Sequence, residues 1–97
     1  MDKINYLLMC LMEECGEISQ AAGKVGRFGI SSKPPGGGLP NNEYLVLEIN
    51  DFLGVLELLK EEGIDLTGIG NREAIEAKKK KLLHFMEISK NLGIITS

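Results

Sequence analysis

Five carboxylates in two short motifs are the residues of this chain best suited to chemistry. Glu13, Glu14 and Glu17 form the first motif, and Glu48 and Asp51 form the second. Both motifs lie in apolar sequence with helical periodicity. A carboxylate held against apolar neighbours either takes up a proton or finds a cation. Because no equal number of basic residues accompanies these carboxylates, the pattern indicates a bound divalent metal.

The spacing inside each motif supports this interpretation. Residues three or four apart share one face of an α-helix, so Glu13, Glu14 and Glu17 project to one side of their helix and Glu48 and Asp51 to one side of theirs. Glu13 and Glu17 repel each other by about 0.2–0.5 kcal/mol in an isolated helix unless a cation lies between them. An ordinary solvated acidic face stays open as the alternative for the first motif. The second motif borders a packed apolar surface, so a solvated acidic face explains it less well.

Composition predicts a single domain, residues 1–97, of ordinary globular character with 43% hydrophobic residues. A chain this small, with only 5% aromatic residues, is expected to complete its core with another copy of itself, as a dimer or a tetramer. The net charge of -3 argues against binding to a nucleic acid polymer.

The same composition predicts a soluble, cytoplasmic protein that does not enter a membrane. No apolar run approaches the roughly 20 residues that span a bilayer, and the N-terminus has no signal-peptide pattern. Cys10 and Cys15 lie five apart on a predicted helix, so their side chains face different directions and cannot form a disulfide with each other. This usage fits core thiols in a reducing cytosol.

Hydrophobic periodicity predicts an all-α fold of about three to four helices, with helices at about 3–27, 41–62 and 71–91 and a loop at 29–40. The loop holds three prolines and a glycine triplet, which a helix does not accommodate. Asn41 or Asn42 is expected to cap the second helix and Asn71 the third. The residues expected to face the core of the bundle are Ile4, Leu8, Leu11, Cys15, Ile18, Ala22 and Val25, then Leu45, Ile49, Phe52, Leu56 and Leu59, then Ile75, Leu82, Phe85 and Met86.

The ordered pair of motifs, Glu-Glu-x-x-Glu at 13–17 and Glu-x-x-Asp at 48–51, resembles the MazG-like all-α nucleoside triphosphate pyrophosphatase superfamily. The leucine-rich continuation after Asp51 and the Lys-Val-Gly-Arg-Phe-Gly segment at 24–29 add to the likeness, which covers roughly residues 5–90. The short form is most similar to stand-alone MazG-like proteins of bacteria and their phages.

The resemblance implies a Mg²⁺-dependent enzyme, with Mn²⁺ as a possible substitute, that cleaves a nucleoside or deoxynucleoside triphosphate between its α and β phosphates. It assigns metal binding to Glu14, Glu17, Glu48 and Asp51, with two ions per site. The catalytic residues that it implies are Glu13, Glu14 and Glu17. Glu13 either joins the metal ligands or orients the attacking water. A purine deoxynucleotide such as dGTP is the expected substrate of the short form.

Basic residues are then expected to contact phosphate. Lys24 lies two turns beyond Glu17 and Arg27 one turn further, although a surface role or a pairing with Gln20 explains Lys24 equally well. Lys78 and Lys81 share a face of the third helix within a run of four lysines, and a run of this kind is often only a solvated face.

Other functions have weaker support. His84 lacks the Glu-x-x-His spacing of di-iron bundles and a partner for a catalytic triad, so it is expected to be a packing or surface residue. Phe28 or Tyr44 could stack on a base or simply pack. The main alternative to an enzyme is a helical oligomerisation or regulatory module whose acidic cluster holds a metal structurally.

Overall fold

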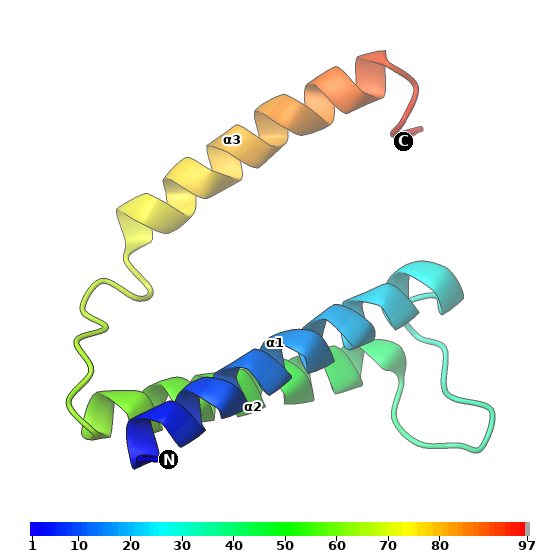
Figure 1. Ribbon diagram of the computed structural model, residues 1–97. Coiled ribbons are helices and arrows are strands. Elements are labelled where there is room, and N and C mark those ends of the chain that lie inside the picture. Colours follow the sequence, from blue (N-terminus) through cyan, green and yellow to red (C-terminus); the bar gives the residue numbers. More distant parts are fainter. Residues whose placement is uncertain (97) are drawn as a thin grey trace. The chain divides into compact units, whose positions relative to one another are not determined.

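The computed structural model describes residues 1–96, which contain three helices and no strand (Figure 1). The helices are α1 (Lys3–Phe28), α2 (Asn41–Glu61) and α3 (Arg72–Asn91). The predicted all-α fold is therefore confirmed, with helix ends within a residue of those expected. The chain divides into two compact units, Met1–Asp65 and Leu66–Ser97, and each is described by itself below.

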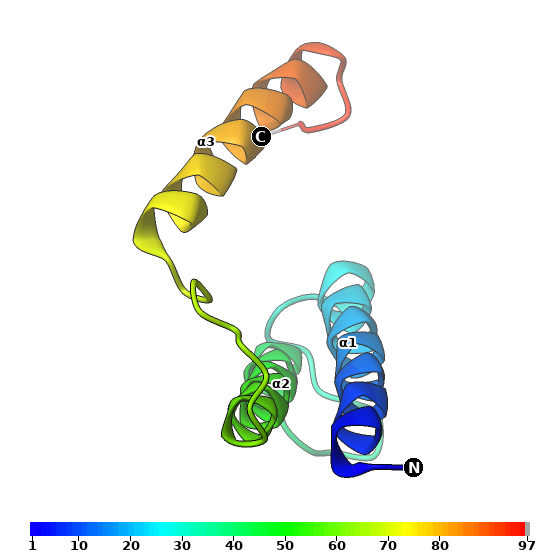
Figure 2. The same ribbon diagram turned by 60° about the vertical axis from the view of Figure 1, so that its left-hand side comes forward.

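The first unit is an antiparallel hairpin in which α1 and α2 lie side by side along their lengths (Figures 1 and 2). Its interior is thin. Only Ala21 and Leu59 among the hydrophobic residues described are fully buried, at 6% and 1% exposure. The rest of the contact consists of half-buried side chains, as expected when only two helices pack against each other.

The row of α1 side chains that faces α2 differs from the predicted one. Leu8, Cys15 and Ala22 were expected in this row but are exposed. The row instead follows a spacing of three and four through Ile4, Leu7, Leu11, Glu14, Ile18, Ala21 and Val25. The two rows share four of their residues and each of the other three moves by one position, so the centre of the row turns by roughly 40° around the helix. The observed row brings a glutamate, Glu14, into the contact between the helices.

The row of α2 side chains that faces α1 also combines apolar residues with one glutamate. Leu45, Phe52, Leu56 and Leu59 face α1 as predicted. Ile49 was also expected there but is 40% exposed, whereas Glu48 is half buried in the contact. Each helix of the hairpin therefore places one glutamate among its packed apolar residues.

The loop at 29–40 is tied to the start of α2 by hydrogen bonds. Asn41 was one of two candidate helix caps, but Pro40 occupies the N-cap position and no side chain caps α2. The Asn41 side chain, 4% exposed, instead donates through Nδ2 to the Gly29 carbonyl at 3.0 Å. Its backbone N–H donates to the Ser32 carbonyl at 2.9 Å. A proline at the N-cap leaves this asparagine free to anchor the loop.

The second unit consists of α3 and its flanking turns. Asn71 caps α3 as predicted, because its side-chain oxygen accepts a hydrogen bond from the Ala74 N–H at 2.8 Å. The expected buried side of this helix is not buried: Ile75, Leu82, Phe85 and Met86 are 38–50% exposed. A single helix has no second surface against which to bury its apolar stripe.

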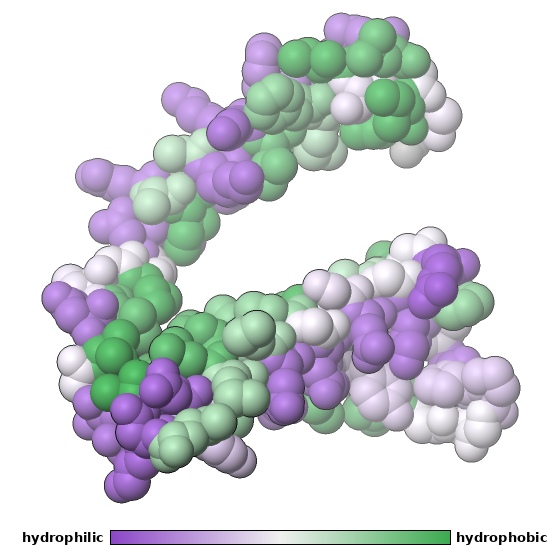
Figure 3. Space-filling model, viewed as in Figure 1, coloured by the Kyte–Doolittle hydropathy of each residue, from purple (hydrophilic) through white to green (hydrophobic). Residues whose placement is uncertain are grey.

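Hydrophobic residues reach the surface of both units (Figure 3). None of the helices in residues 1–96 is both long enough and apolar enough to cross a membrane.

Candidate metal centre

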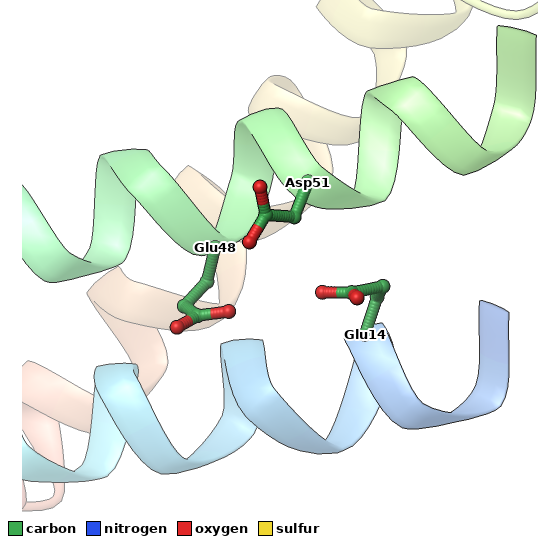
Figure 4. Close-up of side chains that lie close together, drawn as sticks. All are labelled: Glu14, Glu48 and Asp51. Atoms are coloured by element: carbon green, nitrogen blue, oxygen red, sulfur yellow. The ribbon is translucent and has the colours of Figure 1, made fainter. Parts of the chain in front are cut away.

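Glu14 of α1 and Glu48 and Asp51 of α2 bring their carboxylates together across the hairpin. One oxygen from each lies within 4.8 Å of the other two, and the three side chains point toward a common space between the helices (Figure 4). Two oxygens on opposite sides of one Mg²⁺ are about 4.2 Å apart, since each Mg–O bond is about 2.1 Å. A small adjustment of the side chains is therefore enough to place all three oxygens on one ion.

Burial and mutual repulsion disfavour the ionised form of the carboxylates in this cluster. Partial burial raises the pKa of Glu14 above its ordinary value, and the charges of Asp51, Glu17 and Glu13 raise it further. Burial is also the largest cause of the raised pKa of Glu48, followed by the charges of Glu17, Asp51 and Glu14 and a hydrogen bond with the Glu17 side chain. Every cause disfavours the ionised form, so a bound cation would stabilise the carboxylates that the fold leaves uncompensated.

Within residues 1–96, no ion pair reaches Glu14, Glu48 or Asp51. In addition, Oε2 of Glu14 is buried and accepts no hydrogen bond. A buried carboxylate oxygen without a partner is costly, and it is the kind of atom that a metal ion satisfies. The carboxylate oxygens are ligands that Mg²⁺, Mn²⁺ and Ca²⁺ all accept.

The remaining predicted acids lie beside this triad. Glu17 and Glu48 both line a cavity of about 260 Å³, here called the acidic cavity, and the charge of Glu17 raises the pKa of Glu48. Glu13 is exposed on α1 and acts on the triad only through its charge. Three of the four predicted metal ligands therefore form the triad, while Glu17 lies beside it and Glu13 at its margin.

The residues predicted to bind phosphate lie in separate parts of the structure. Lys24 lines the acidic cavity together with Glu17 and Glu48. The Arg27 guanidinium lies over the Phe28 ring, 5.3 Å from its centroid. Lys78 and Lys81 lie on α3 in the second unit, where both are exposed. Lys24 is thus the basic residue that shares a cavity with the carboxylates.

Sequence reasoning missed several residues of this region. Gln20 and Pro34 line the acidic cavity, and so does Asn41, which had been assigned only a capping role. The fold brings the proline loop back over α1, which local sequence does not reveal. The one available signal is the Pro40-Asn41 pair, since a proline before a helix can take the cap position and release the next side chain.

Comparisons with protein-family models, with curated proteins and with solved structures found no match for this chain.

Proposed function

We propose that this protein is a Mg²⁺-dependent pyrophosphohydrolase of nucleoside or deoxynucleoside triphosphates, with a site of the MazG-like kind. The observation that carries the proposal is the triad of Glu14, Glu48 and Asp51, which face one another from two helices within 4.8 Å. It is supported by the uncompensated Glu14 oxygen and by the resemblance of both acidic motifs. Mn²⁺ is expected to replace Mg²⁺, because both accept oxygen ligands.

The carboxylates have two tasks in the proposed reaction. Glu14, Glu48 and Asp51, with Glu17 beside them, hold one or two divalent ions. When bound, these ions neutralise polyphosphate oxygens and polarise the bond to be cleaved. Water forms the new P–O bond, the bridging bond between the α and β phosphates breaks, and pyrophosphate leaves with the electron pair. Glu13 and Glu17 are the candidates for accepting the water's proton.

Lys24 is the best placed basic residue for the substrate. It lines the acidic cavity with Glu17 and Glu48, so its ammonium group can reach phosphate oxygens that the metal leaves uncovered. That Arg27, Lys78 and Lys81 also contact phosphate stays a prediction from their spacing in the sequence.

We also propose that the hairpin pairs with a second copy to form a four-helix core, as a dimer or within a tetramer. Two helices bury little by themselves, and α1 carries a second apolar row at a spacing of four and three, Leu8, Met12 and Cys15, which is exposed. Leu53 and Ile49 of α2 are 45% and 40% exposed. Sedimentation equilibrium of the purified chain tests this proposal, and a monomer at micromolar concentration would contradict it.

The deciding experiment incubates the full chain with Mg²⁺ and each common NTP and dNTP, and resolves the products by anion exchange. Monophosphate plus pyrophosphate is expected from at least one nucleotide, and Glu17→Gln and Asp51→Asn should each lose this activity while keeping their helicity. Glu57→Gln is the matched control, because Glu57 lies exposed on α2 outside the cluster. Metal binding without any turnover would instead favour the non-catalytic oligomerisation or regulatory module.

A further inference from the structure

A second cavity adjoins the acidic cavity in the first unit. This loop cavity, about 440 Å³, lies against the segment 29–40. It shares three lining residues with the acidic cavity, namely Lys24, Pro34 and Asn41. The two spaces therefore meet, and a ligand bound at the carboxylates can extend from one into the other.

The chemistry of the walls changes along this path. The acidic cavity presents the Glu17 and Glu48 carboxylates, Lys24 and Tyr44, whereas the loop cavity adds Phe28 and Pro35, together with Lys33, to the shared Pro34. An aromatic ring and two prolines offer flat apolar surfaces, which suit the face of a planar ring better than they suit a phosphate. The loop cavity alone, at about 440 Å³, falls in the volume range of small-molecule sites.

We propose that the loop cavity receives the base of the nucleotide, which stacks on Phe28 while the phosphates bind at the carboxylates. This assignment rests on the proposed function for its phosphate end. The Arg27 guanidinium lies 5.3 Å from the centroid of the Phe28 ring, and this contact favours a fixed orientation of the ring. Lys24, at the junction of the two cavities, faces the phosphates.

The walls of the loop cavity are held in place before any ligand binds. The Asn41 side chain, almost fully buried, holds the Gly29 carbonyl at 3.0 Å. The Asn41 and Asn42 N–H groups hold the carbonyls of Ser32 and Ile30 at 2.9 and 3.0 Å. A preformed cavity spares the ligand the entropy cost of ordering a loop. A stacking site on an otherwise mobile segment would lack this advantage.

The test compares Phe28→Ala with Ile30→Ala in the full chain. Both side chains are 63% exposed, so neither truncation uncovers a core, and Ile30 does not line the loop cavity. Phe28→Leu, which keeps an apolar side chain but removes the ring, is the second variant. The probes are the α,β-methylene analogues of the four common dNTPs, inorganic tripolyphosphate and Mn²⁺, with binding measured by calorimetry.

The proposal predicts that both Phe28 variants bind the tightest analogue at least about fivefold more weakly. Tripolyphosphate and Mn²⁺ should bind within twofold of the wild-type values, and Ile30→Ala should match the wild type throughout. Unchanged analogue binding in the Phe28 variants would overturn the base assignment, and so would a wild type that binds tripolyphosphate but none of the analogues.

This binding experiment and the anion-exchange product assay, run on the same variants, separate this proposal from the proposed function. Analogue binding that depends on Phe28, in a protein that hydrolyses no nucleotide, would support the base site and contradict the pyrophosphohydrolase. Turnover of a dNTP that is insensitive to Phe28 would support the enzyme and overturn the base site.

Discussion

Replacing Glu48 with glutamine is expected to stabilise the metal-free protein. Burial and the charges of Glu17, Asp51 and Glu14 raise the pKa of Glu48, so at pH 8 the folded state carries a charge that its surroundings disfavour. Glutamine keeps the shape of the side chain and removes this charge. The metal-free variant should therefore melt at a higher temperature than the wild type at pH 8, which scanning calorimetry in the presence of a chelator would measure.

This stabilisation should depend on pH in a defined direction. For a carboxyl whose pKa is raised by folding, the stability gained from protonation is fully present below the ordinary value of 4.5 and is lost as the pH rises through the folded-state pKa. At pH 4 the wild-type Glu48 is protonated and resembles glutamine. The difference in Tm between the variant and the wild type should thus be small at pH 4 and grow toward pH 8.

In the presence of metal the same substitution should have the opposite effect. At a Mn²⁺ concentration about 100 times Kd, binding is expected to raise the Tm of a small domain by about 10–20 °C. Loss of one of the three clustered carboxylates is expected to weaken binding by about 100-fold, because loss of even an outer-shell partner of a metal ligand costs about 10–100-fold. At the same Mn²⁺ concentration the variant should then gain only about 2–3 °C.

Glu57→Gln is the control for these melting experiments, because it makes the same chemical change at an exposed position of the same helix. It should leave the Mn²⁺-induced rise in Tm intact. The reasoning is refuted if Glu48→Gln lowers the Tm of the metal-free protein at pH 8, or if the variant keeps the full rise with Mn²⁺.

Three further substitutions test the loop and the lone histidine. Asn41→Ala leaves a loop carbonyl without its donor and should lower the free energy of unfolding by about 1–3 kcal/mol in urea titrations; an unchanged midpoint would contradict the anchoring role. Gly38→Ala should cost about 1–3 kcal/mol, since Gly38 has a φ of 118° and an added Cβ would lie 2.7 Å from the Tyr44 hydroxyl. Gly36→Ala, which meets no atom within 4 Å, is its control. His84→Gln should keep nucleotide turnover within a few fold in the product assay, and a loss of several orders of magnitude would show that His84 takes part in the reaction.

The helices and the identity of the clustered acids could be predicted from the sequence. Apolar periodicity, the three prolines and the Asn71 cap are local signals, and they place each helix end within a residue of its observed position. Glu14, Glu48 and Asp51 stood out because they interrupt apolar sequence at helical spacing. Their assignment to one metal site came from the resemblance to the MazG-like superfamily.

The details of the packing could not be predicted in the same way. The α1 row through Leu8 and Cys15 and the row through Leu7 and Glu14 fit the same periodicity almost equally well. The first is the more hydrophobic, so a criterion based on hydrophobicity selects it. Likewise, the role of Asn41 depends on the return of the loop to Gly29, which lies twelve residues back in the chain.

The sequence by itself determined the helical segments and the set of carboxylates, because both depend on interactions among residues within about one helical turn. Only the tertiary structure decided which face of α1 meets α2, and hence that Glu14 points into the hairpin while Glu13 stays exposed. The physical reason is that periodicity is a property of one helix, whereas the rotation of that helix about its axis is set by the side chains of its neighbour.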